Sequence, residues 1–251
     1  MRKKLIIFGV FLLIAFALFS REIKQGAMRD VDFAATVKIQ EKIDTSSRLR
    51  TARFVGEIME GSTFLASPVV SVIAVLMFTL FAIMEGSHTS IPKPASKSKH
   101  TDGRFAYFRL VIPLAFGILV LAEIYGKTVV HHPAPPFFMI KNPTTIFPKY
   151  YINDEFSYPS GHAARAVFIG IIASCVMHHA SGKRKDLRKK MLILSTLAAY
   201  VSLVSVSRIY LGHHWLSDVI GGWLLGGGMG TLATGIDAPW ATSYNRKAMS
   251  T

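Results

Sequence analysis

The chain has 251 residues, of which 51% are hydrophobic and only 18% are charged, and its mean hydropathy is positive. This composition argues against a soluble globular protein and indicates a membrane-embedded one. The net charge of +14 suits a nucleic-acid binder, a partner of anionic lipids or phosphates, or basic cytoplasmic loops, and the long apolar runs favour the last two. Cys175 is the only cysteine, which excludes an intrachain disulfide.

Six apolar stretches follow one another along the chain, at residues 5–20, 63–84, 108–125, 163–177, 191–206 and 219–236. A helix needs about 20 residues to cross the hydrocarbon layer, so the shorter stretches must extend into their flanks. The sequence therefore predicts an all-α fold, a polytopic membrane six-helix bundle, formed by one membrane-embedded domain over residues 1–251.

The first stretch, within residues 1–20, is expected to be a membrane span or signal anchor. Three basic residues, a short apolar core and an Ala-Phe-Ala sequence at 15–17 also resemble a cleavable signal peptide, but an uncleaved first span makes the six stretches alternate consistently. The mixed-charge segment 21–62 is expected to form amphipathic helices on the outer membrane surface. Residues 63–236 then supply the remaining five spans.

Basic residues set the predicted orientation. With the N-terminus in the cytoplasm, the inner segments contain the basic residues of 2–4, 93–104, 183–190 and 246–247, which is a strong positive-inside pattern. Residues 86–103 are predicted to be a cytoplasmic linker, and residues 237–251 a cytoplasmic tail. In the last span Gly222, Gly226 and Gly230 share one helix face, which lets another helix approach closely.

Polar residues with catalytic potential gather in two segments that this topology places on the outer side, 126–162 and 207–218. His214 and Asp218 are four residues apart at the start of a predicted helix, so we expect them on one face. The carboxylate would fix the imidazole tautomer and leave the other ring nitrogen available for attack.

The same outer side offers groups that bind an anion. Ser160, Gly161 and His162 are predicted at a helix N-terminus, where backbone N–H groups favour phosphate. Lys127 and Arg208 add two cations that can balance a phosphoryl group. With His162 as general acid, these residues predict phosphoryl transfer through a phosphohistidine.

These residues resemble the motifs of the type 2 phosphatidic acid phosphatase family of membrane lipid phosphatases, which shares its site with vanadium haloperoxidases. The family pattern is Lys, six residues, Arg-Pro; then Pro-Ser-Gly-His; then Ser-Arg, five residues, His, three residues, Asp. The second and third parts are intact, as Pro159 to His162 and as Ser207-Arg208 with His214 and Asp218.

The resemblance implies a role for each matching residue and implies no metal or other cofactor. It makes His214 the nucleophile, oriented by Asp218, and His162 the general acid. It assigns phosphate binding to Lys127, Ser160, Gly161 and Arg208.

The first part of the pattern departs from the family. The position of the motif Arg is occupied by Ala134, and losing one charge-assisted contact of this kind should cost about 2 to 4 kcal/mol of transition-state binding. The residues that could replace it are His131, His132, Lys141 and Arg165.

The sequence thus predicts a hydrolase that removes a phosphate from a lipid, such as undecaprenyl pyrophosphate, phosphatidylglycerol phosphate, phosphatidic acid or lipid A, at the outer face of a bacterial inner membrane. Its expected partners are the phosphorylated lipid and the surrounding membrane lipids, with no nucleic acid; no oligomeric state is indicated. The chief alternative is a weakly active or non-catalytic protein that binds or flips a polyprenyl phosphate. A second alternative uses the histidine pairs at 131–132, 178–179 and 213–214 as haem or metal ligands.

Overall fold

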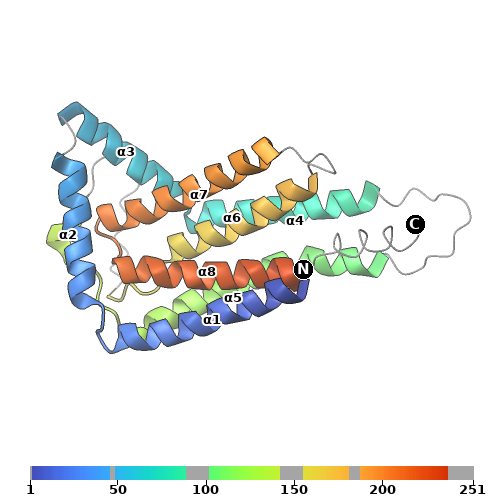
Figure 1. Ribbon diagram of the computed structural model, residues 1–251, viewed down its shortest axis with the longest axis horizontal. Helices are drawn as coiled ribbons and strands as arrows, with labels where there is room; N and C mark the ends of the chain where they lie inside the picture. The colour runs from blue at the N-terminus through green and yellow to red at the C-terminus, as the bar shows by residue number, and fades with distance from the viewer. Residues whose placement is uncertain (1, 46–48, 89–101, 142–154, 181–186, 237–251) are drawn as a thin grey trace, which may run out of the picture.

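The computed structural model describes all residues except 1, 46–48, 89–101, 142–154, 181–186 and 237–251 (Figure 1). The predicted tail therefore lies outside the described residues, as does most of the predicted linker. The helices are α1 (Arg2–Lys24), α2 (Arg29–Thr45), α3 (Leu49–Leu65), α4 (Pro68–His88), α5 (Asp102–Val130), the 3₁₀ turn η1 (Phe137–Met139), α6 (Gly161–Ala180), α7 (Leu187–Tyr210) and α8 (Leu216–Ile236).

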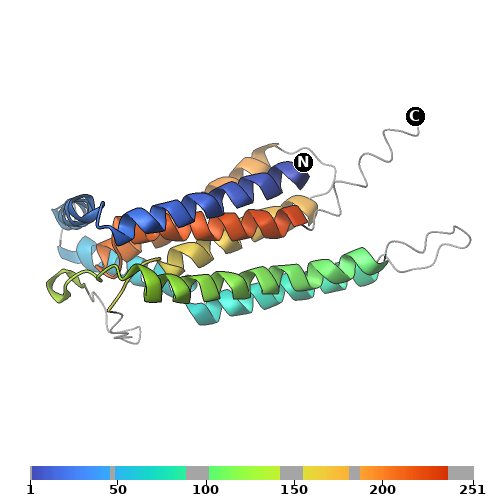
Figure 2. The same ribbon diagram turned by 90° about the horizontal axis from the view of Figure 1, so that it is seen from below.

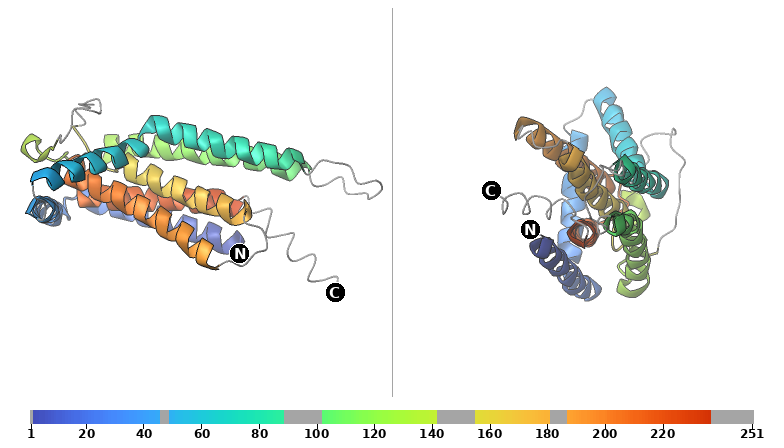
Figure 3. Two further views of the ribbon diagram at one scale, coloured as in Figure 1. Left: turned by 90° about the horizontal axis from the view of Figure 1, so that it is seen from above. Right: turned by 90° about the vertical axis from the view of Figure 1, so that its right-hand side faces the viewer.

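The long helices run along the long axis of the molecule, and α2 lies across one end of the bundle (Figure 1). Helix α1 packs along α8, α6 packs against α7 and α8, and α4 pairs with α5. Figure 2 and the left view of Figure 3 show α4 and α5 side by side along one flank. The ends of α5 and α7 and the starts of α6 and α8 meet at the end that α2 covers.

The all-α polytopic fold is confirmed, although the spans are less uniform than predicted. Among the residues that the structure describes, four helices are long and apolar enough to cross a membrane: Arg2–Lys24, Leu110–Val130, Lys190–Tyr210 and Leu216–Ile236. A fifth candidate combines Phe54–Leu65 and Pro68–Phe81, which are bent by 51°. In the described part of the chain, the predicted fourth span, residues 163–177, is an apolar stretch of α6 over Gly161–Met177.

The second predicted span begins too early. Residues 63–65 belong to α3, and the chain bends before α4 begins at Pro68. Proline has no N–H to donate and clashes with the preceding turn, so it ends one helix and suits the first position of the next. The helices expected within residues 21–62 are present as α2 and α3.

Apolar side chains both fill the bundle and cover it. The main core contains Ile112 and Leu119 of α5, Phe168 of α6 and Leu225 of α8. Many other large apolar side chains are exposed on the outer faces of the long helices, among them Ile7, Phe11, Leu76, Leu114, Leu121 and Leu192. So much exposed apolar surface would be unfavourable in water, and with the apolar helices it identifies an integral membrane protein.

The predicted close approach at the glycines of α8 is confirmed, and the partner is α6. A Cβ added at Gly222 would lie 2.5 Å from the carbonyl oxygen of Ser160, and one at Gly226 would overlap the backbone of Ala164. The opposite face of α8 receives α1, where a Cβ at Gly228 would lie 2.6 Å from Leu13. Helix α8 is therefore closely packed between α1 and α6.

Candidate active site

The two intact motif segments meet at the end of the bundle that α2 covers. The backbone N–H of Ser160, directly before α6, donates to the carbonyl oxygen of Asp218 in the first turn of α8, at 2.9 Å. Tyr158 anchors the approach to α6, because its ring is fully buried and stacks on Phe16, and its hydroxyl lies 2.9 Å from Ser20 Oγ. Helix α1 thus supports the loop that delivers Ser160.

His214 is placed by the end of α7. Gly212 adopts a φ of +70°, a left-handed conformation that ends a helix at low cost in glycine. The N–H groups of His213 and His214 then both donate to the carbonyl oxygen of Arg208, at 3.1 and 3.2 Å. This turn directs the buried His214 side chain back toward Asp218.

The sequence placed His214 and Asp218 together on one face of a helix, and this detail is wrong. Helix α8 begins at Leu216, so His214 lies in the preceding turn. The two side chains are nevertheless close, with His214 Nδ1 3.4 Å from Asp218 Oδ2, at the long limit for a hydrogen bond. The same Oδ2 accepts the backbone N–H of Trp215 at 2.8 Å, as expected for a carboxylate in the first turn of a helix.

The surroundings of His214 keep its imidazole neutral. Burial lowers the pKa of His214 to about 4, and the positive charges of Arg208 and Lys127 act in the same direction, whereas Asp218 opposes the shift. Near neutral pH the ring nitrogen that faces away from Asp218 therefore carries a lone pair. Such a nitrogen can act as a nucleophile or a base.

The N-terminus of α6 provides donors for an anion. Ser160 is fully buried, and its Oγ has no hydrogen-bond partner within the described part of the chain. Gly161 is the first residue of α6, and His162 follows it, half-buried. Buried polar groups are normally paired, so an unsatisfied hydroxyl beside the first N–H groups of a helix suits an oxyanion ligand.

Two of the four candidates for replacing the motif Arg are engaged in ion pairs. Arg165 is buried and pairs with Glu123 of α5. Lys141 pairs with the exposed carboxylate of Asp44 and lies 4.7 Å from the ring of Tyr210. The pair of Arg165 with Glu123 lies at the start of α6, because the Glu123 carboxylate packs against Gly161. Lys141 is instead held by Asp44.

The other two candidates lie directly after α5. His131 is exposed, and its ring packs edge-on against Phe156. His132 is buried, and its Nδ1 lies 2.9 Å from Asp218 Oδ1. Ala134 itself is half-buried and donates its N–H to the carbonyl oxygen of Glu155 at 3.3 Å.

Asp32 is a buried acidic residue at this end of the bundle that the sequence analysis did not single out. It comes from α2 and accepts hydrogen bonds from the N–H and Oγ of Ser217, at 2.8 and 2.7 Å. Burial raises the pKa of this carboxyl, and the bonds from Ser217 oppose the shift. Asp32 is one of several acidic residues in a mixed-charge segment, so no local pattern marked it.

Within the described chain, no group of three histidine, cysteine or acidic side chains is arranged to hold a metal ion. Residues 178–179 lie near the opposite end of α6 from His162. The three histidine pairs therefore do not come together at one place.

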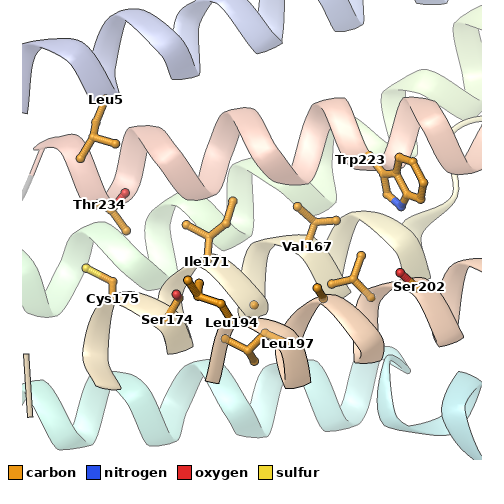
Figure 4. Close-up of a pocket in the computed structure, with 13 residues that line it drawn as sticks. Leu5, Val167, Ile171, Ser174, Cys175, Leu194, Leu197, Ser202, Trp223 and Thr234 are labelled. Atoms are coloured by element: carbon orange, nitrogen blue, oxygen red, sulfur yellow. The ribbon is translucent and has the colours of Figure 1, made fainter. Parts of the chain in front are cut away.

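An apolar pocket of about 640 Å³ lies between α6, α7 and α8, with α1 at its far end (Figure 4). The end of the pocket closer to the polar site is lined by Val167, Ser202 and Trp223, and the opposite end by Leu5 and Thr234. Trp223 is five residues past Asp218, which places it about 7 to 8 Å further along α8. The pocket thus lies along the helices that carry the polar site, further from the end of the bundle where that site is.

Comparison with known proteins agrees with this geometry. Over 130 residues the chain is 34% identical to a protein named undecaprenyl-diphosphatase from Sulfolobus acidocaldarius, a match that covers 51% of this chain and 55% of that protein. Over 73 residues it is 37% identical to phosphatidylglycerophosphatase B from Bacillus subtilis, covering 29% of this chain and 34% of that protein. The chain thus matches about half or less of the length of these curated relatives.

The crystal structure of a transmembrane PAP2-type phosphatidylglycerolphosphate phosphatase from Bacillus subtilis has the same fold. It superposes with a TM-score of 0.63 at 22% identity, over 92% of this chain and 96% of that one. The family model of the PAP2 superfamily matches residues 105–239, more than half of the chain, including all residues of the two intact motifs. This chain belongs to the PAP2 superfamily.

Proposed function

We propose that this protein is a membrane lipid phosphatase that hydrolyses a phosphomonoester or pyrophosphate of a lipid through a phosphohistidine. The observation that carries the proposal is the joining of the two motif segments at Ser160 and Asp218. It sets a buried, neutral imidazole beside an unsatisfied hydroxyl and a helix N-terminus. An attacking group and an anion site in one place are what phosphoryl transfer requires.

In the proposed mechanism the Nε2 lone pair of His214 attacks phosphorus while the bond from phosphorus to the leaving oxygen breaks. His162 donates a proton to that oxygen, and the lipid departs. Water then attacks the phosphohistidine, its proton passes to His162, and the phosphorus–nitrogen bond breaks. Inorganic phosphate leaves, and both histidines return to their starting states.

The remaining groups stabilise charge during these steps. We assign the binding of the phosphoryl oxygens, where negative charge must be held throughout transfer, to Arg208, Lys127 and the N-terminus of α6. The positive charges of both side chains already act on the His214 imidazole. Asp218 stabilises the imidazole ring as it becomes positively charged. No step in this mechanism uses a metal ion.

The substrate is proposed to be an amphiphile with its phosphate at headgroup depth. The polar site lies at one end of an apolar bundle, and the adjacent pocket offers an apolar wall for a hydrocarbon chain. The names of the two curated relatives favour undecaprenyl pyrophosphate and phosphatidylglycerol phosphate, and phosphatidic acid and lipid A have the same chemistry. The basic residues at 2–4 and 188–190, at the opposite end of the bundle, support a site on the outer face of a bacterial inner membrane.

Phosphate release from each of these four lipids, measured with purified protein, tests the proposal. The wild type should release phosphate, and His214→Ala should reduce release to background. Gly117→Ala is a control outside the site, because a Cβ at this helical position in α5 would meet nothing within 4 Å. Equal release from wild type and His214→Ala would rule out His214 as nucleophile.

The absence of the motif Arg at position 134 favours one second candidate, a protein that binds or flips a polyprenyl phosphate without cleaving it. That candidate predicts saturable binding of the lipid phosphate and no release by the wild type. Measuring binding and release in the same preparation separates the two functions.

A further inference from the structure

Asp218 contacts two histidines, and the family motif includes only one of them. Its Oδ2 faces His214, whereas its Oδ1 lies 2.9 Å from Nδ1 of His132. All three side chains are buried, with exposed fractions of 0% for Asp218, 5% for His132 and 6% for His214. At 2.9 Å between two buried groups, the contact of His132 with the carboxylate is a full hydrogen bond, with the ring Nδ1–H as donor.

The backbone around His132 is held in a way that keeps this side chain inward. Helix α5 ends at Val130, and His131 adopts a φ of +54°, which residues with a Cβ rarely adopt. The carbonyl oxygen of His132 then accepts the N–H of Ser157 at 2.9 Å. The backbone of His132 is thus held by the turn that ends α5 and by a hydrogen bond from the segment that leads into α6.

The outer side of His132 faces a second carboxylate. Its Nε2 lies 3.8 Å from Asp32 Oδ2, and Asp32 is held by its two hydrogen bonds from Ser217. His132 therefore lies between an acidic residue of α2 and the acidic residue of the α8 motif. The ring thus has Nδ1 toward Asp218 and Nε2 toward Asp32.

We propose that His132 is a positioning residue for the reaction, which holds the Asp218 carboxylate so that Oδ2 stays directed at His214. The inference rests on the proposed function. A carboxylate with donors on both oxygens cannot rotate about its last bond without losing one of them, and losing a buried hydrogen bond is costly. Without His132, Oδ1 loses this donor, and the hydrogen bond from the Trp215 N–H to Oδ2 is left to hold the carboxylate against rotation away from His214.

Three substitutions at one position test this role. Asparagine places its amide nitrogen close to the position of the histidine Nδ1 and can still donate to Asp218. Glutamine places its amide nitrogen near the position of Nε2, and leucine fills similar space without a donor. The assay is phosphate release from a short-chain phosphatidic acid, with kcat and KM determined separately and the thermal midpoint measured for each variant.

We expect His132→Leu and His132→Gln to lose about 10- to 100-fold in kcat, as is common for residues that orient a reacting group, with KM nearly unchanged. His132→Asn should retain kcat within a few-fold of wild type. Wild-type kcat in His132→Leu, or equal losses in all three variants, would overturn the assignment while leaving the proposed function intact. A wild type that releases no phosphate from any of the four lipids would overturn the proposed function and this inference with it.

Discussion

Replacing Gly222 by alanine tests the contact that brings the two motif segments together. The added Cβ would lie 2.5 Å from the Ser160 carbonyl oxygen, 3.0 Å from the Cβ of Ala163 and 3.1 Å from the backbone nitrogen of Ala164. Backbone atoms and a Cβ cannot rotate away, so α6 and α8 must separate by about 1 Å to restore ordinary contacts. Overpacking of this kind costs about 1–3 kcal/mol, against a gain of about 1 kcal/mol for alanine in a helix.

Gly117→Ala is the matched control, because Gly117 is also helical and a Cβ there would meet nothing within 4 Å. The assays are the thermal midpoint in detergent and the rate of phosphate release. Gly117→Ala should match or exceed the wild-type midpoint and keep the wild-type rate. Gly222→Ala should melt below the control and react about 100-fold more slowly, since about 1 Å of misplacement at a reacting centre has this effect. Equal midpoints and rates for the two variants would refute the contact between Ser160 and α8.

Three further outcomes are expected. Because burial lowers the pKa of His214 to about 4, its imidazole stays neutral above that value. On the acid side of the pH profile, kcat/KM corrected for substrate ionisation should therefore fall only as the pH approaches 4, and an acid limb centred at the ordinary value of 6.5 would contradict this assignment. Lys141→Ala should keep kcat/KM within about twofold, because the side chain pairs with Asp44 in an exposed ion pair, and a tenfold loss would show that Lys141 binds phosphate. Gly170→Phe should raise KM for a long-chain lipid phosphate and leave KM for a short-chain one unchanged. A Cβ at Gly170 meets only Val201, at 3.6 Å, so the phenylalanine ring would enter the apolar pocket. An equal effect on both KM values would exclude the pocket from substrate binding.

Much of the fold was predictable because the long helices of the bundle contain continuous apolar runs. The glycines of α8 were also informative, since a spacing of four indicates a close helix contact whichever helix supplies it. The bend between α3 and α4 was missed because the apolar run continues through it, and only Pro68 marks the break.

The grouping of the site residues could be predicted only where the motif spacing implied it. Ser160 and Asp218 belong to recognisable motifs, so their segments were expected at one face, and the structure joins them directly. The contact of His132 with Asp218 spans 86 positions, and that of Asp32 with Ser217 spans 185. No local periodicity relates such distant residues, because their proximity depends on how the helices pack.

The position of Asp32 limits which segments could be exchanged between this protein and its relatives to make a chimera. The stretch that matches the PAP2 superfamily begins at residue 105, whereas Asp32 lies far upstream in α2. A chimera that transplanted only the matched stretch would inherit every motif residue, yet the first turn of α8 would lose its acceptor at Ser217. A donor segment for such an exchange must therefore include α2, or the recipient must offer a carboxylate at the same point.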